Sequence, residues 1–152
     1  MTFIGDGNNV ANSLIICGAI LGIKLRIACP KGFEPNCKTL SKMCGIDIEN
    51  VLEIYHDPIE AVKGANVLYT DVWSSMGEEN KKDEKDKIFK GFTINNTLVS
   101  KTQKDSIILH CLPAYRDREI TDEVIDSSQS RIFNQAENRM YAQQALLACL
   151  LS

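Results

Sequence analysis

Short apolar segments alternate with turns and longer helical segments along the whole chain. Glycine, proline or polar residues follow most of these apolar segments, as at the ends of buried strands. Strands that alternate with helices are typical of a parallel sheet covered by helices. We therefore predict an α/β fold with three α/β/α layers around an open, mainly parallel, Rossmann-like sheet. The predicted strands are residues 3–4, 24–29, 53–55, 67–70 and 107–109.

The helical segments are recognised by their ends. Gly22 follows the first of them, and glycine readily adopts the left-handed conformation in which many helices end. Asp57 and Pro58 begin another, because Asp caps helix N-termini and Pro is favoured at the first helical position. Residues 131–133 are predicted as a strand or extended segment, and the charge-rich stretch 78–90 as an exposed helix or a mobile loop. The predicted helices are residues 9–21, 35–44, 58–63, 97–102, 121–124 and 137–151.

Composition narrows the class of ligand. The 152 residues carry a net charge of -3, which gives no basic surface for nucleic acid, so a small molecule fits better. The six cysteines form no C-x-x-C pair or zinc-ligand spacing, and the histidines number two, so we expect no metal site. Reduced thiols indicate a cytoplasmic protein. The apolar stretch 15–25 lacks a preceding basic region and is too short to span a bilayer, so we expect no signal peptide and no membrane contact.

The stretch GDGNNVANSL, residues 5–14, follows a predicted strand and opens a predicted helix. A G-x-G turn in this place can bind a nucleotide phosphate. Val10 occupies the third glycine position, however, and residues 25–30 lack the acid that would bind a ribose, so this interpretation is disfavoured. The amides of Asn8 and Asn9 can instead bind a zwitterionic ligand, or one of them can cap the helix.

Three polar clusters follow predicted strands, and a parallel sheet brings such strand ends to one edge. The clusters are residues 8–9, 71–77 and 110–113, and the cluster 137–139 at the predicted start of the last helix adds a cation. Together they suit an amino acid, with its charged groups held by amides and a carboxylate and its side chain directed toward a thiol. His110 is either a packed imidazole or a catalytic one, and Pro113 fixes the turn, in cis or in trans.

Four segments resemble the second, ornithine-binding domain of ornithine carbamoyltransferases. They are GDGNNVANSL (5–14), TDVWSSMGEE (70–79), HCLPAYRDREITDEV (110–124) and FNQAENRMYAQQALL (133–147). Their order and spacing match that family along the whole chain, so the resemblance covers residues 1–152. Two details separate close relatives. In aspartate-using members, the segment that corresponds to residues 110–113 resembles H-P-L-P. Putrescine-using members lack the Ser-Met-Gly found here at residues 75–77.

The resemblance implies transfer of a carbamoyl group from carbamoyl phosphate to the δ-amine of L-ornithine, giving citrulline and phosphate, without a metal or organic cofactor. By this resemblance, the residues that hold the ornithine backbone groups are Asn9, Asp71, Ser75 and Met76. Those that contact the carbamoyl group are Cys111, Leu112 and Arg139. Cys111 also lies beside the δ-amine, and we expect Cys111, Arg139 and Asp71 to be the catalytic residues. Residues 75–77 lead the loop that closes over ornithine.

The family also has a first domain, with a Ser-x-Arg-Thr-Arg segment and a His-x-x-Gln element that bind carbamoyl phosphate. Neither is present here, so we expect a fragment, or the product of a split or truncated gene, that is inactive alone. A non-catalytic module that binds an amino acid or a partner subunit is the alternative. Family members are homo-oligomers, typically trimers. The segment 145–151 is apolar on every side, so we expect it to dock on a second copy or to expose an apolar surface.

Overall fold

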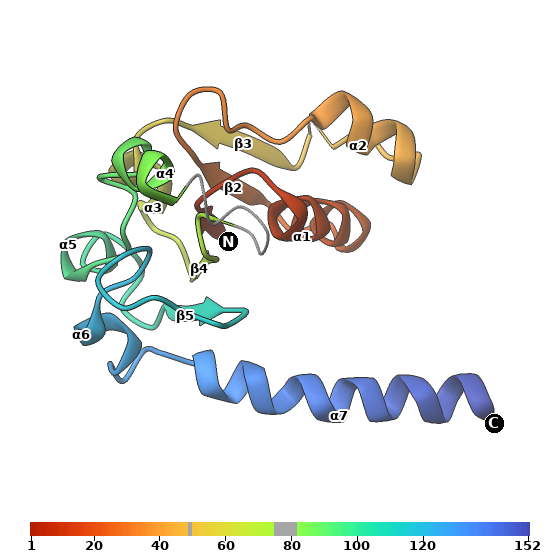
Figure 1. Ribbon diagram of the computed structural model, residues 1–152. Coiled ribbons are helices and arrows are strands. Elements are labelled where there is room, and N and C mark those ends of the chain that lie inside the picture. Colours follow the sequence, from red (N-terminus) through yellow and green to blue (C-terminus); the bar gives the residue numbers. More distant parts are fainter. Residues whose placement is uncertain (49, 75–81) are drawn as a thin grey trace.

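Five strands form one sheet in which every pair is parallel, in the order β3-β2-β1-β4-β5 (Figure 1). The computed structural model describes residues 1–48, 50–74 and 82–152. The strands are β1 (Thr2–Ile4), β2 (Leu25–Ala28), β3 (Leu52–Tyr55), β4 (Val67–Thr70) and β5 (Ile107–His110). The predicted parallel sheet is therefore confirmed, and each predicted strand up to residue 109 is present.

Helices cover both faces of the sheet, which confirms the three-layer α/β/α prediction (Figure 1). On one face lie α1 (Asn9–Leu21) and α2 (Cys37–Cys44). The other face carries α3 (Pro58–Val62), α4 (Lys82–Ile88), α5 (Asn96–Val99) and α6 (Asp122–Ile125). The last helix, α7 (Ile132–Leu151), starts beside β5 and runs away from the sheet (Figure 1).

Alternation along the strands divides the apolar side chains between two cores, because neighbouring strand residues point to opposite faces. Ile4 and Leu68 pack on the side of α3 to α6. Phe3 and Tyr69 pack with α1 and α2. Cys111 follows β5 and packs against this second core, so the orientation of the candidate thiol is set by the pleat of the sheet.

The local signals at the helix ends are confirmed. The side chain of Asn8 caps α1 by accepting a hydrogen bond from the Val10 N–H, and Gly22 ends that helix with a φ of 67°. Asp57 accepts from the Ile59 N–H at 2.8 Å and caps α3. In each case the fold follows a preference that acts within a few residues.

The prediction for residues 131–133 was wrong, because Ile132 already begins α7. Ile132 is buried against the sheet, and a buried β-branched apolar residue has the sequence pattern expected of a strand. Ser130, two residues before Ile132, forms an isolated parallel bridge to Ile108. The cluster 137–139 therefore lies inside α7 and does not open it.

The charge-rich stretch 78–90 contains a helix, α4, and a helix was one of the two structures predicted for it. Residues 78–81 lie outside the described part of the chain. The helix is not simply a solvated surface. Lys85 is buried and its ammonium group pairs with Asp6 at 2.9 Å. A buried charge requires a partner, so this position has a structural role that composition alone did not indicate.

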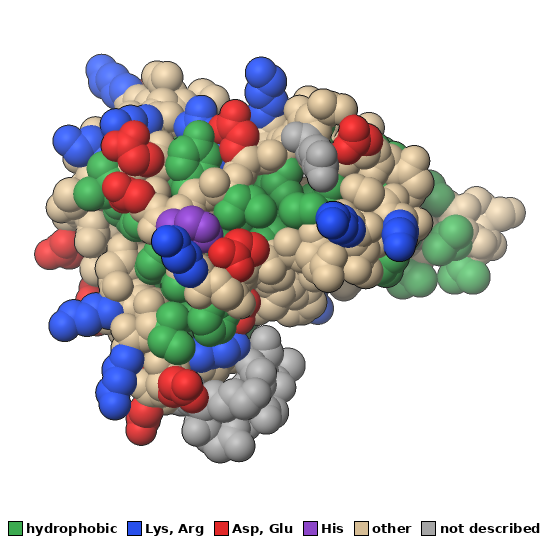
Figure 2. All heavy atoms as spheres, turned by 90° about the horizontal axis from the view of Figure 1, so that it is seen from above, with side chains coloured by type: hydrophobic (Ala, Val, Ile, Leu, Met, Phe, Trp, Pro, Cys, Tyr) green, Lys and Arg blue, Asp and Glu red, His purple; other side chains and the backbone are tan. Residues whose placement is uncertain are grey.

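Helix α7 leaves the body of the molecule with its apolar residues in solvent (Figure 1). Seen from above, charged side chains are spread over the body, and hydrophobic ones lie both on the middle of the body and on the part that projects to the right (Figure 2). Leu150 and Leu151 are 71% and 83% exposed. The predicted exposed apolar surface is therefore present. None of the helices in the described ranges is long and apolar enough to cross a membrane.

Candidate functional site

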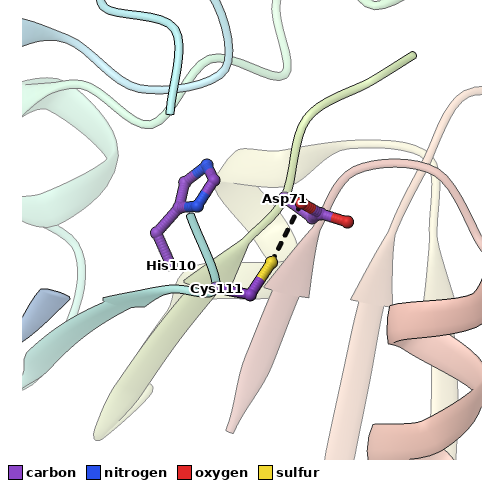
Figure 3. A group of neighbouring side chains, drawn as sticks. All are labelled: Asp71, His110 and Cys111. Carbon is purple, nitrogen blue, oxygen red and sulfur yellow. Dashed lines mark hydrogen bonds between the residues drawn. The ribbon is translucent and has the colours of Figure 1, made fainter. Parts of the chain in front are cut away.

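The carboxylate of Asp71 and the thiol of Cys111 meet at the carboxyl edge of the sheet (Figure 3). Thr70 of β4 lies opposite His110 of β5 in the parallel register, so the residues that follow them leave the sheet side by side. The thiol of Cys111 donates a hydrogen bond to Oδ1 of Asp71, with 3.0 Å between sulfur and oxygen. The prediction that these two strand ends share one edge is confirmed.

The thiol remains protonated at neutral pH. Burial, then the hydrogen bond to Asp71 and the charge of that carboxylate, raise the pKa of Cys111 to about 12. A thiolate in this place would be poorly solvated and would face a like charge. Cys111 is therefore a neutral donor toward Asp71.

Asp71 keeps one oxygen for another partner. Its Oδ1 accepts from Cys111 and, at 2.8 Å, from the Val72 N–H. Among the described residues, no hydrogen bond uses Oδ2, which points away from Cys111 (Figure 3). A carboxylate fixed through one oxygen and open at the other suits an ammonium group, which carries N–H donors and no acceptor.

Beneath the thiol, Gln135 joins three elements, a link that the sequence did not reveal. Its amide donates to the hydroxyl of Tyr69 on β4 at 2.8 Å, and its carbonyl accepts from the backbone N–H of His110 on β5 at 3.1 Å. Burial, followed by the neighbouring Cys111, raises the pKa of Tyr69 to about 12. The first turns of α7 are thus locked to the floor of the site.

His110 is a packed imidazole, the first of the two roles considered. It is fully buried, and its Nδ1 accepts a hydrogen bond from the Leu112 N–H at 2.9 Å. Nε2 must then carry the proton of the neutral ring, and it donates to Glu119 at 3.2 Å. Glu119, which sequence reasoning missed, also accepts from the Tyr115 N–H at 2.6 Å. His110 and Glu119 therefore hold the turn that follows Cys111.

That turn has two unusual backbone features. Leu112 has a φ of 58°, in the left-handed region that residues with side chains rarely adopt. The Leu112–Pro113 peptide bond is cis, which settles the alternative left open at Pro113. The turn directs the backbone after Cys111 away from the sheet toward α6 (Figure 1).

Asp71, His110 and Cys111 place their ligand-type atoms within 4.8 Å of one another, yet their chemistry does not suit a metal ion. Both ring nitrogens of His110 already have hydrogen-bond partners. The imidazole also lies on the other side of the strand end from the sulfur and the carboxylate (Figure 3). A neutral thiol with a raised pKa is a poor ligand as well.

The GDG turn does not fit a phosphate. The Gly7 N–H, which would have to face a phosphate, donates instead to the Phe33 carbonyl at 2.9 Å. A Cβ on Gly7 would lie 2.5 Å from that same oxygen, so the glycine allows close contact between two parts of this chain. Asn9, the candidate binding residue, is exposed in the first turn of α1, while Asn8 serves as the cap.

Of the other predicted site residues within the described ranges, Leu112 lies beside the thiol and Arg139 does not. Leu112 adjoins Cys111, half-buried against the core. Arg139 is exposed on α7 and lines a surface hollow of about 430 Å³ with other α7 residues; within the described part of the chain, no hydrogen bond or ion pair joins it to Asp71 or Cys111. Ser75 and Met76 lie outside the described residues.

Comparison with known proteins matches the chain to one family. The family described as "Aspartate/ornithine carbamoyltransferase, Asp/Orn binding domain" matches residues 1–150. The chain belongs to the aspartate/ornithine carbamoyltransferase family. An ornithine carbamoyltransferase of Prochlorococcus marinus subsp. pastoris is 69% identical over 152 residues, covering 99% of this chain and 49% of that protein. The catabolic ornithine carbamoyltransferase of Thermoplasma acidophilum is 51% identical, over 99% of this chain and 50% of its own length.

Solved structures of the family share the fold. The ornithine carbamoyltransferase of Pyrococcus furiosus superimposes with a TM-score of 0.86 at 47% identity, covering 97% of this chain and 48% of that one. The chain thus spans about half the length of the curated relatives it matches. It corresponds to the Asp/Orn-binding domain of the family, and the resemblance read from the four sequence segments is confirmed.

Proposed function

We propose that the chain is the ornithine-binding half of an ornithine carbamoyltransferase. The observation that carries this proposal is the contact of the Cys111 thiol with the Asp71 carboxylate at the carboxyl edge of the sheet. The family assignment supports it, because the matching family domain is described by its aspartate or ornithine ligand. Cys111, which stands where the H-P-L-P motif of aspartate-using members has its first proline, favours ornithine.

The binding roles follow from the charges of the ligand. Oδ2 of Asp71 accepts from the α-ammonium group of ornithine, with Asn9, Ser75 and Met76 holding the remaining backbone groups. The alkyl chain then runs over the half-buried Cys111. Because the thiol proton is directed to Asp71, the sulfur lone pairs face the δ-amine and accept a hydrogen bond from one of its N–H groups.

The reaction requires a free amine. At pH 7, removing a proton from an alkyl ammonium with a pKa near that of Lys costs about 4–5 kcal/mol. A pocket with a neutral thiol favours the uncharged amine more than water does, because burial disfavours charge. The δ-nitrogen then bonds to the carbamoyl carbon, the bond from that carbon to the phosphate oxygen breaks, and the amine loses its second proton as phosphate leaves.

Arg139 is the proposed cation for the carbamoyl oxygen, with Cys111 and Leu112 as its other contacts. Stabilising a developing negative charge there is worth about 3–4 kcal/mol in comparable sites. Arg139 stands on the exposed part of α7, so this role requires the rest of the enzyme to bring α7 and the strand ends together. Carbamoyl phosphate is accordingly proposed to bind only with the first domain.

The proposal extends to assembly and compartment. Six free cysteines, all in the described part of the chain, suit the reducing cytoplasm. The exposed apolar surface of α7 supports contact with the first domain, and we propose the homotrimer typical of the family as the state of the completed enzyme.

The test combines binding with catalysis. Isothermal titration of the chain should show binding of L-ornithine and weaker binding of L-norvaline, which lacks only the δ-amine. Asp71→Asn should abolish both, and Asp57→Asn, which alters a helix cap elsewhere, should change neither. With the first half of the Prochlorococcus relative and carbamoyl phosphate added, citrulline should form, and Cys111→Ala should slow transfer far more than it weakens ornithine binding. Failure to bind ornithine and to form citrulline would refute the proposal.

A further inference from the structure

Two adjacent residues of α4 form ion pairs with two different loops of the site. Lys85 pairs with Asp6 in the loop between β1 and α1, with 2.9 Å between Nζ and Oδ2. Asp86 accepts a hydrogen bond from Nε of Arg118, at 2.6 Å, in the loop between β5 and α6. The first loop leads directly into Asn9, the first residue of α1, and the second begins at Cys111.

Neither pair is a freely solvated surface contact. The side chains of Lys85 and Asp6 are 10% and 14% exposed; that of Arg118 is 12% exposed, and its partner Asp86 is 35% exposed. Charges removed from water are screened little by salt, and removal of one partner leaves the other charge poorly solvated. These pairs therefore fix the position of α4 much more firmly than an exposed ion pair would.

Arg118 also contacts the segment that follows β4. Its guanidinium lies over the ring of Trp73, 5.8 Å from the centroid, and Nη2 donates to the hydroxyl of Ser74 at 3.5 Å. Trp73 stacks on Phe89, just after α4, with 5.5 Å between ring centroids. Arg118 thus binds both the end of the β4 segment and the helix that follows it in the chain.

We propose that α4 is a clasp, and that Arg118 is its positioning residue. Through Asp86 and Lys85, the clasp fixes the loop that leads into Asn9 relative to the loop that carries Cys111. The consequence for ornithine rests on the proposed function, since a ligand that touches both loops needs them at a fixed spacing. Arg118 itself does not touch the ligand.

The structural part of the proposal is tested without ornithine. In ¹H–¹⁵N spectra, Arg118→Gln should shift the amides of residues 6–10, on the opposite side of α4, and Asp86→Asn should reproduce those shifts. The double variant should add nothing further, because both changes break the same pair. Arg116→Gln is the matched control, since Arg116 lies two residues away in the same loop but pairs with Asp122 and Asp126. Unchanged amides at residues 6–10 in Arg118→Gln and Asp86→Asn would overturn the clasp.

The functional part is measured as ornithine affinity. Arg118→Gln and Asp86→Asn should each raise the Kd for ornithine about tenfold, as expected when binding groups are misplaced by a fraction of an ångström. Arg118→Lys should recover part of the loss, and Arg116→Gln should stay within about twofold of the unaltered chain. Equal affinity in all variants would overturn the positioning role and leave the proposed function intact. If the unaltered chain binds no ornithine, the proposed function fails, whereas the amide shifts still decide on the clasp.

Discussion

The carboxyl edge of the sheet and helix α7 differ in how far their side chains are hydrogen-bonded and buried by other residues of this chain. At the sheet edge, Asp71, His110 and Cys111 are held by hydrogen bonds to groups from other parts of the chain. Beyond Gln135, α7 is exposed along its length, with Leu150 and Leu151 in solvent. One region is assembled by the chain itself, and the other presents apolar surface that needs another partner to bury it.

The comparison explains how a chain that spans about half the length of its relatives can have an ordered sheet edge. The contacts at that edge come from strands and loops within residues 1–135, so they do not depend on the other half of the relatives. Helix α7 carries Arg139, the proposed cation, on a surface that this chain leaves open. Ornithine binding should therefore survive in the isolated chain better than catalysis does.

The largest effect is expected at Glu119. Glu119→Ala removes the acceptor of the hydrogen bonds from Nε2 of His110 and from the Tyr115 N–H. We expect the free energy of unfolding to fall by about 2–6 kcal/mol, or about 1–3 kcal/mol for each of the two hydrogen bonds lost, measured by urea denaturation. Glu123→Ala, which removes an exposed contact with Asn96, should stay within about 0.5 kcal/mol. Similar losses in both variants would show that the buried hydrogen bonds at the sheet edge stabilise the fold no more than an exposed contact does.

Alkaline pH should weaken the buried edge. Burial holds the pKa of Cys111 and of Cys29 at about 12, above the ordinary 9.0. Between these values the unfolded chain has lost protons that the folded chain keeps, so stability is complete below pH 9 and falls as the pH rises. The slope should reach about 1.4 kcal/mol per pH unit for each thiol. In Cys29→Ala/Cys111→Ala, denaturation curves from pH 8 to pH 11 should show a shallower fall; an unchanged slope would exclude these thiols as its cause.

Two glutamines test the comparison within α7 itself. Gln135→Ala removes the hydrogen bonds to Tyr69 and His110, so we expect a loss of about 1–3 kcal/mol in unfolding free energy. Gln143→Ala makes the same change on the exposed part of the helix and should shift stability by no more than about 0.5 kcal/mol. Equal effects in thermal or urea melts would mean that the first turns of α7 are no better anchored than the rest.

The smallest effect on folding is expected at the end of α7. Leu150→Glu should change the unfolding free energy by less than about 0.5 kcal/mol, because the side chain is already in solvent. It should nevertheless reduce binding of an apolar dye and any self-association seen by light scattering, whereas Gln144→Glu should reduce neither. A clean monomer with little dye binding in the unaltered chain would contradict an accessible apolar surface.

Much of the fold followed from signals that act over short distances. Gly22 and Asp57 marked helix ends, and the order of apolar segments predicted the parallel sheet. Because parallel strands end at one edge of a sheet, the sequence alone predicted that Asp71 and Cys111 lie close together, as the structure shows. Ile132 was misassigned because a buried β-branched residue has the same pattern in a strand and in the first turn of a helix.

The missing parts of the site are long-range pairs of polar side chains. Gln135 with Tyr69, His110 with Glu119 and Arg118 with Asp86 are each formed between different elements. Such pairs have no fixed spacing in a sequence, and glutamine, glutamate and arginine usually lie on the surface. Charge density around α4 therefore indicated solvent, while the fold turned Lys85 inward.

The most direct test of the account is a titration of the ¹⁵N-labelled chain with L-ornithine, followed at the amides of Asp71 and Cys111. The account predicts that both amides shift together in a saturable manner, and that Asp71→Asn removes the response while the spectrum stays that of a folded protein. Saturable shifts confined to other parts of the chain, or no shifts at all, would contradict the claim that this edge of the sheet binds ornithine.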